Sequence, residues 1–123
     1  MTYEDMMTFA QDWVANWNWR DVEAVLSHFA EDAEFVSPLA LQYSGRAALH
    51  GKAEISGYWR AGMQRLNKIE FTFDHASWDE RLKELTVLYT ANLNGDRKRA
   101  CEIMRFGDDG LQTRGEALYG AAV

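Results

Sequence analysis

The stretch ELTVLYTANLNGDRKRACEIMRF, residues 84–106, decides the fold because it holds two strand-like runs joined by a tight turn. The dipeptide Asn94-Gly95 between them is the strongest short-range signal for a β-hairpin. In the first run, apolar side chains recur at every second position and would share one face of a strand: Leu85, Val87, Tyr89 and Ala91. The segment therefore predicts an antiparallel hairpin with one face turned toward a core.

Similar patterns continue on both sides of this hairpin. Residues 68–78 read KIEFTFDHASW and alternate, which predicts a strand followed by a turn at residues 79–81. Its apolar face would hold Ile69, Phe71, Phe73 and His75. GDDG at residues 107–110 predicts another turn, and residues 111–120 predict a last strand. The second half of the chain is thus expected to form a four-stranded meander.

The first part of the chain has helical spacing instead. Thr2 and Asp5 predict a helix cap, and an apolar stripe follows at helical intervals: Met6, Phe9, Ala10, Trp13, Val14 and Trp17. Asn18 is expected to interrupt this helix and to cap a second one. The buried face of the second helix would hold Val22, Val25, Leu26 and Phe29.

A strand and a third helix complete the predicted elements. The strand would cover residues 33–37 and end at Pro38, the only proline, because proline cannot donate to a sheet ladder. Residues 39–50 are expected to be irregular, and residues 52–66 to form the third helix.

Helices near one end of the sequence and antiparallel strands at the other define the α+β class. We expect three N-terminal helices packed on a curved, mostly antiparallel sheet, within one domain spanning residues 1–123. A curved sheet wrapped around helices forms a cone, and the inside of such a cone can be a binding pocket.

Composition and charge exclude several classes of function. The net charge is −6, whereas nucleic-acid binding needs clustered Lys and Arg, so no nucleic-acid partner is expected. The one cysteine, Cys101, permits no internal disulfide and supports no metal cluster, so neither a metal nor another cofactor is expected. The N-terminus lacks signal-peptide features and no run reaches membrane-spanning length, which predicts a cytoplasmic protein without a membrane partner.

A single acidic residue, Glu102, stands out within the second strand of the hairpin. By alternation it shares its face with three apolar residues, Ala100, Met104 and Phe106. Charged residues are almost never fully buried without a partner. A carboxyl group in apolar surroundings would have a raised pKa and could donate or accept a proton near neutral pH. The alternative is a structural pairing with an Arg or with the indole N–H of Trp13 or Trp59.

Three stretches carry a resemblance to a known superfamily: NWRDVEAVLSHFAEDAEFVSP (18–38), HGKAEISGYW (50–59) and EIMRFGDDG (102–110). Taken with the order of elements, they resemble the nuclear transport factor 2-like superfamily, and within it the SnoaL-like and ketosteroid isomerase branch. The resemblance implies a cystatin-like, cone-shaped barrel with an apolar cavity. It also implies activities such as isomerisation, cyclisation or dehydration, and fold alone does not choose among them.

The comparison with ketosteroid isomerase can be made residue by residue. The general base of that enzyme, an Asp before the proline that ends the first strand, corresponds to Ser37, which cannot act as a carboxylate base. Its oxyanion hole uses a Tyr and a protonated Asp, and these positions correspond to Trp13 and Glu102. Two supporting tyrosines correspond to Phe29 and Trp59. The resemblance therefore implies a pocket with one carboxyl group, but not a true ketosteroid isomerase.

Other polar residues extend the candidate site. His75 would lie at the pocket rim and could pair with Glu102, although a lone His on an apolar face is more often hydrogen-bonded in the core. Ser37 could bind a ligand oxygen, and Tyr89 and Tyr119 could offer phenol hydroxyls. The candidate catalytic residues are thus Glu102 and His75. The candidate ligand-binding residues, many of them equally explained as core, are Trp13, Trp17, Phe29, Ser37, Trp59, Phe71, Phe73, Tyr89, Met104 and Tyr119.

Two functions are compatible with these residues. The first is a cofactor-free isomerase, cyclase or lyase that binds an apolar, carbonyl-containing molecule and moves a proton through Glu102. The second is a non-catalytic binding domain in which Glu102 anchors the polar end of the ligand. An assembly role would need a broad exposed apolar patch, which the polar outer faces do not suggest. The family resemblance also implies a homodimer through the outer sheet face, which Thr86, Leu88, Thr90, Cys101, Ile103 and Arg105 would populate.

Overall fold

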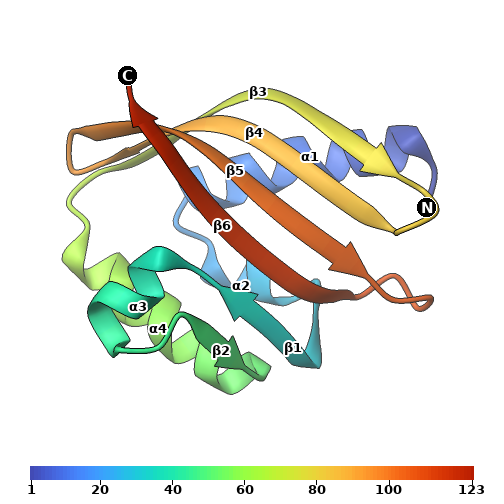
Figure 1. Ribbon diagram of the computed structural model, residues 1–123, viewed down its shortest axis with the longest axis horizontal. Helices are drawn as coiled ribbons and strands as arrows, with labels where there is room; N and C mark the ends of the chain where they lie inside the picture. The colour runs from blue at the N-terminus through green and yellow to red at the C-terminus, as the bar shows by residue number, and fades with distance from the viewer.

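One six-stranded sheet forms the framework of the molecule, in the order β2-β1-β6-β5-β4-β3. The computed structural model describes residues 1–123. The strands are β1 (Phe29–Val36), β2 (Ala48–His50), β3 (Ile69–Asp79), β4 (Glu84–Leu93), β5 (Asp96–Phe106) and β6 (Gln112–Ala122). Neighbouring strands are antiparallel except for β1 and β6, which are parallel. The long strands bend together in Figure 1, so the predicted α+β fold with a curved, mostly antiparallel sheet is confirmed.

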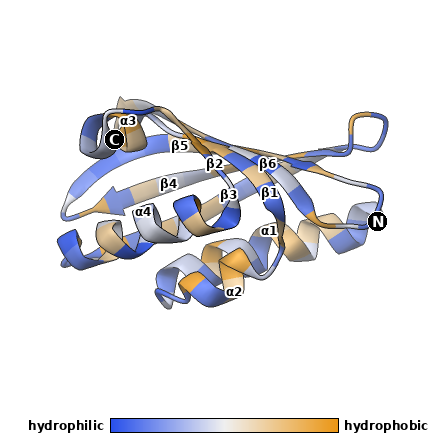
Figure 2. Cartoon of the chain, turned by 90° about the horizontal axis from the view of Figure 1, so that it is seen from below, coloured by the Kyte–Doolittle hydropathy of each residue, from blue (hydrophilic) through white to orange (hydrophobic).

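Four helices accompany the sheet: α1 (Tyr3–Asn18), α2 (Val22–Leu26), α3 (Pro38–Ser44) and α4 (Lys52–Arg65). Figure 2 shows α1, α2 and α4 beneath the same face of the sheet, whereas α3 lies at one end of it. The sheet therefore has one face covered by helices and one outer face.

The first helix begins and ends through side-chain hydrogen bonds. Thr2 Oγ1 accepts from the Asp5 N–H, and the Asp5 carboxylate accepts from the Thr2 N–H, which is the predicted capping box. Asn18 ends α1 as predicted, but the prediction that it caps the second helix is wrong, because its side chain bonds both backbone groups of Phe71 on the edge strand β3. The cap of α2 is Asp21, whose carboxylate accepts from the Ala24 N–H.

The segment expected to be irregular contains two short elements, α3 and β2. Ser37 is the N-cap of α3, and Pro38 occupies its first turn, where a missing N–H costs nothing. The proline that ends β1 therefore also begins a helix. Gly45 ends α3 with a φ of 78°, a conformation that glycine adopts without strain. Phe29, expected on the second helix, is instead the first residue of β1.

A β-bulge in β3 changes the face on which His75 lies. The register of β3 with β4 shifts between Phe73, which pairs with Tyr89, and His75, which pairs with Leu88. Because a bulge inserts one extra residue, every side chain after it moves to the opposite face. The prediction that His75 continues the apolar face of Phe71 and Phe73 is therefore wrong.

Edge-to-face aromatic contacts join the helices to the covered face of the sheet. Trp13 of α1 lies 5.3 Å from Tyr89 of β4, and Trp17 lies 5.0 Å from Trp59 of α4, measured between ring centres. Such pairs contribute about 0.5–1.5 kcal/mol beyond the burial of their area. They also fix the position of α1 relative to the sheet and relative to α4.

Candidate functional site

A pocket of about 410 Å³ opens between the covered face of the sheet and the helices. Its walls come from α1, α3 and α4 and from strands β1, β3, β4, β5 and β6, and most of its lining residues are hydrophobic. The size and apolar lining are typical of a small-molecule site. Polar side chains gather at two places, one at the inner end and one at the mouth.

Glu102 occupies the inner end of this pocket. The register of β5 sets it between Val87 of β4 and Ala117 of β6, and only 4% of its surface is exposed. Burial, together with a smaller contribution from the negative charge of Glu116, raises the pKa of Glu102 to about 8. Neither an arginine nor an indole N–H pairs with the carboxyl group, so the structural pairing is absent and the predicted inward placement is confirmed.

Gly115 of β6 makes room for this carboxyl group. A Cβ atom at Gly115 would lie 3.2 Å from Glu102 Oε2, 3.2 Å from a ring carbon of Phe35 and 3.0 Å from Gln112 Nε2. Gln112 is itself buried, and its Oε1 atom has no hydrogen-bond partner. Any larger residue at position 115 would therefore push on the carboxyl group and on its neighbours.

Three phenols line the pocket, and two of them, Tyr89 and Tyr119, lie beside Glu102. Burial raises the pKa values of Tyr89 and Tyr119 well above their usual range, and the nearby Glu102 carboxyl raises both further. Burial raises the pKa of Tyr58 and its interaction with the Ser37 hydroxyl lowers it, so that the pKa is about 12. The hydroxyl groups of Tyr89 and Tyr119 interact with each other. All three phenols therefore stay neutral at physiological pH and can donate hydrogen bonds.

Ser37 lies at the pocket wall, but its hydroxyl already has structural partners. Its Oγ accepts from the Leu39 N–H at 3.2 Å and interacts with the Tyr58 hydroxyl. The residue is 2% exposed. Ser37 is therefore a helix cap that supports Tyr58, with no neighbouring base to make it a nucleophile.

The structure brings together eight of the predicted site residues: Trp13, Trp17, Ser37, Trp59, Phe71, Tyr89, Glu102 and Tyr119 all line the pocket. Phe29, Phe73 and Met104 pack in or against the core instead. His75 lies on the outer face with its side chain 59% exposed and its Nδ1 3.3 Å from Asp74 Oδ1. It cannot pair with Glu102 from there.

Several lining residues were missed at the sequence level. Tyr58 is the most important, because its hydroxyl interacts with Ser37 at the pocket wall, and its place beside Trp59 in the third predicted helix offers no signal for the pocket. The residues at the mouth come from α3, from the end of α4, from the β4–β5 turn and from the start of β5, and they are Gln42, Tyr43, Arg65, Asn94, Asp96 and Lys98. Only tertiary contacts bring these segments together.

No group of three or more His, Cys, Asp or Glu side chains gathers in a way that could hold a metal ion. No helix is both long enough and apolar enough to cross a membrane.

The fold and the pocket together define a cystatin-like, nuclear transport factor 2-like protein with a cavity between sheet and helices. A family model described as the SnoaL-like domain matches residues 10–115. The chain belongs to this SnoaL-like family, and the predicted superfamily is confirmed.

Solved structures agree with this assignment. A SnoaL-like protein of unknown function from Burkholderia thailandensis E264 is 26% identical, with a TM-score of 0.88 and 98% of each chain covered. A cystatin-like protein of unknown function from Methylobium petroleophilum PM1 is 21% identical, with a TM-score of 0.78 over 98% of this chain and 79% of that one. An NTF2-like protein of unknown function from Cytophaga hutchinsonii ATCC 33406 is 14% identical, with a TM-score of 0.69 over 97% of this chain and 90% of that one. The last two show the fold alone, and no curated protein matches the sequence.

Proposed function

We propose that this protein binds a small, apolar, carbonyl-containing molecule in its pocket and exchanges a proton with it through Glu102. The observation that carries this proposal is a buried carboxyl group without a protein partner at the inner end of an aromatic-lined pocket. A buried polar group without a partner is costly, so its presence at a cavity suggests that a ligand supplies the partner.

The protonation state of Glu102 defines the chemistry. With a pKa of about 8, the carboxyl group is mostly neutral at pH 7 and can donate a hydrogen bond or a proton to a carbonyl oxygen. Negative charge that develops on that oxygen would also meet the neutral phenol of Tyr119. The same carboxyl group, once ionised, is a base of suitable strength to take a proton back.

The pocket contains no second free base. Asp96 is the only other carboxylate in the lining, and it pairs with Lys98 at 3.5 Å at the mouth. The proposal is therefore limited to reactions that one acid–base group can serve, such as enolisation and the isomerisation, cyclisation or elimination steps that follow it. Ligand binding without turnover is the alternative function, because a single carboxyl group also suffices as an anchor.

The test uses 2-tetralone, a flat apolar ketone whose α-protons can exchange with D2O. We expect the protein to bind 2-tetralone and to accelerate the exchange seen by proton NMR at neutral pD. The Glu102→Gln variant can still donate a hydrogen bond but not a proton, so it should retain binding and lose about 100-fold or more of the exchange rate. Glu70→Gln, which removes an exposed carboxylate on β3, is the matched control and should behave as the wild type.

Each outcome separates the candidates. Binding with no acceleration by the wild type would favour the binding domain over the enzyme. Full exchange activity in Glu102→Gln would exclude Glu102 as the proton carrier, and no binding of the ketone at millimolar concentration would overturn the proposed ligand class.

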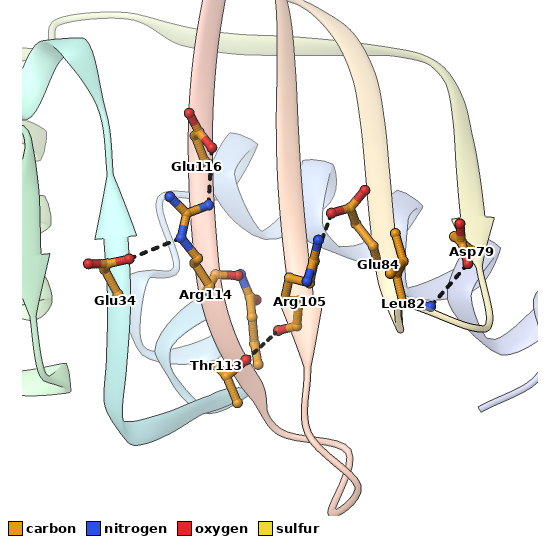
Figure 3. A network of polar contacts seen from close by, with 9 residues as sticks. Glu34, Asp79, Leu82, Glu84, Arg105, Thr113, Arg114 and Glu116 are labelled. Carbon is orange, nitrogen blue, oxygen red and sulfur yellow. Dashed lines mark hydrogen bonds and ion pairs between the residues drawn. The ribbon is translucent and has the colours of Figure 1, made fainter.

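We also propose that the outer sheet face forms a homodimer. Leu88, Cys101 and Leu118 lie in one row across β4, β5 and β6, and Leu118 is 45% exposed. Ion pairs flank this row. Figure 3 shows Arg114 between Glu34 and Glu116, and Arg105 beside Glu84. The N–O distances of these pairs are 2.8–3.0 Å. An apolar centre with a charged border is the usual composition of such interfaces.

A further inference from the structure

The mouth of the pocket carries a cation without an ionic partner. Arg65, the last residue of α4, lines the pocket, and its guanidinium carbon lies 4.7 Å from the centre of the Tyr43 ring on α3. Arg65 takes part in no salt bridge, whereas the other cation of the mouth, Lys98, is paired with Asp96. The mouth therefore presents one uncompensated positive charge, although the net charge of the chain is −6.

The backbone beneath Arg65 is held in place by the β4–β5 turn. Asn94 Nδ2 donates to the Arg65 carbonyl oxygen at 3.3 Å. Asn94 Oδ1 accepts from the N–H groups of Asn67 and Lys68 at 2.7 and 3.0 Å. The cation–π contact with Tyr43 holds the guanidinium group over the ring without using any of its N–H donors. The donors of Arg65 are thus positioned and free.

We propose that the pocket selects apolar acids, in which a carboxylate binds Arg65 at the mouth while a flat apolar body fills the pocket and a carbonyl group reaches Glu102. This inference rests on the proposed function, because it adds a second contact to the same ligand. A guanidinium group matches a planar carboxylate with two parallel hydrogen bonds.

The charges along the pocket suit a ligand with one anionic end. The ionisable groups of the lining, besides the tyrosines, are Arg65, Asp96, Lys98 and Glu102. Because burial keeps Glu102 neutral below about pH 8, the inner end does not repel the carboxylate at neutral pH. Ionisation of Glu102 above this pH would add a second negative charge to the occupied pocket and weaken binding.

The test compares 4-(2-naphthyl)-4-oxobutanoate with its methyl ester, which keeps the naphthyl ketone and replaces the negative charge with a methyl group. Isothermal titration calorimetry at pH 7 should show that the wild type binds the acid about tenfold more tightly than the ester, the effect of one charge-assisted contact. The preference should decrease as salt is added, because the contact lies at an exposed mouth. Arg65→Gln should reduce the preference to within about twofold, because it weakens binding of the acid much more than binding of the ester.

Arg97→Gln is the matched control, because Arg97 lies on the same hairpin but does not line the pocket. It should retain the preference for the acid. This result would show that the preference comes from direct contact with Arg65 and not from the overall positive potential near the mouth. Equal affinity for acid and ester in the wild type, or an unchanged preference in Arg65→Gln, would overturn the inference and leave the proposed function standing. If the protein binds none of the three ketones (the acid, its methyl ester and 2-tetralone), both the inference and the proposed function are overturned.

Discussion

The carboxyl group of Glu102 shows how one residue links stability to function. Its place in the alternation of β5 buries it beside Val87 and Ala117, and no protein group compensates for its charge. Folding therefore favours the neutral form, and the charged form is disfavoured until a ligand or water meets it. The buried carboxyl group therefore lowers the stability of the folded protein, and it remains available as an acid.

The pH dependence of stability should report this cost. Because the folded pKa of about 8 lies above the unfolded value near 4.5, the folded state binds more protons between these values, and stability falls as pH rises. At about 1.4 kcal/mol per pKa unit, the free energy of unfolding should fall by roughly 4 kcal/mol between pH 5 and pH 9 from this group. In Glu102→Gln, the free energy of unfolding should lack this decrease with pH, and the variant should be more stable than the wild type at pH 9.

Urea denaturation at several pH values measures the effect. Glu70→Gln serves again as the control, and it should follow the wild-type slope because Glu70 is exposed and unpaired. Parallel pH profiles for the wild type and Glu102→Gln would show that the carboxyl group ionises as freely in the folded protein as in the unfolded chain.

At the scale of elements, the end of α1 fixes the edge of the sheet. Strand β3 has no neighbour on one side, and edge strands leave backbone groups unpaired. Asn18 Oδ1 accepts from the Phe71 N–H at 2.7 Å, and Asn18 Nδ2 donates to the Phe71 carbonyl oxygen at 2.9 Å. One amide side chain thus satisfies both backbone groups of a residue that lines the pocket.

Asn18→Ala should destabilise the protein by about 1–3 kcal/mol, because it leaves both of these backbone groups without a partner. Asn16→Ala, in the same helix, removes an asparagine whose side chain makes no hydrogen bond with the protein, so it should change stability by less than about 0.5 kcal/mol. Chemical denaturation of both variants measures the difference. Equal stability of the two variants would show that water replaces the Asn18 contacts without cost.

The same scale shows why some elements could be predicted and others could not. The meander and α1 follow from alternation and helical spacing over ten or more residues, and a pattern of that length outweighs local exceptions. Helix α3 and strand β2 are too short to show a period, and Pro38 indicates the end of a strand as readily as the start of a helix. The bulge in β3 has no signature in the residues around His75, so alternation placed this residue on the wrong face.

At the scale of the whole molecule, the two faces of the sheet have separate roles. The covered face carries the pocket, and the outer face carries the apolar row and the ion pairs seen in Figure 3. Placing the two on opposite sides allows the molecule to associate through one face while the other stays open to a ligand. The proposed dimer and the proposed site can therefore be tested independently.

Light scattering at micromolar concentration should give the mass of a dimer for the wild type. Leu118→Lys places a charge in the apolar row Leu88, Cys101 and Leu118, and it should shift the population toward the monomer. Because Leu118 does not line the pocket, the variant should bind 2-tetralone as the wild type does. A wild-type protein that is monomeric at this concentration would exclude the dimer.

The sequence by itself determined the α+β class, the hairpin and the inward position of Glu102, because these depend on periodicity within single segments. The tertiary structure alone decided that Tyr89 and Tyr119 lie beside that carboxyl group, that His75 lies outside the pocket, and that Arg65 meets Tyr43 at its mouth. The physical reason is that these arrangements join segments far apart in the chain. Their distances are set by how α3, α4 and the bent sheet pack together, and no local pattern encodes that packing.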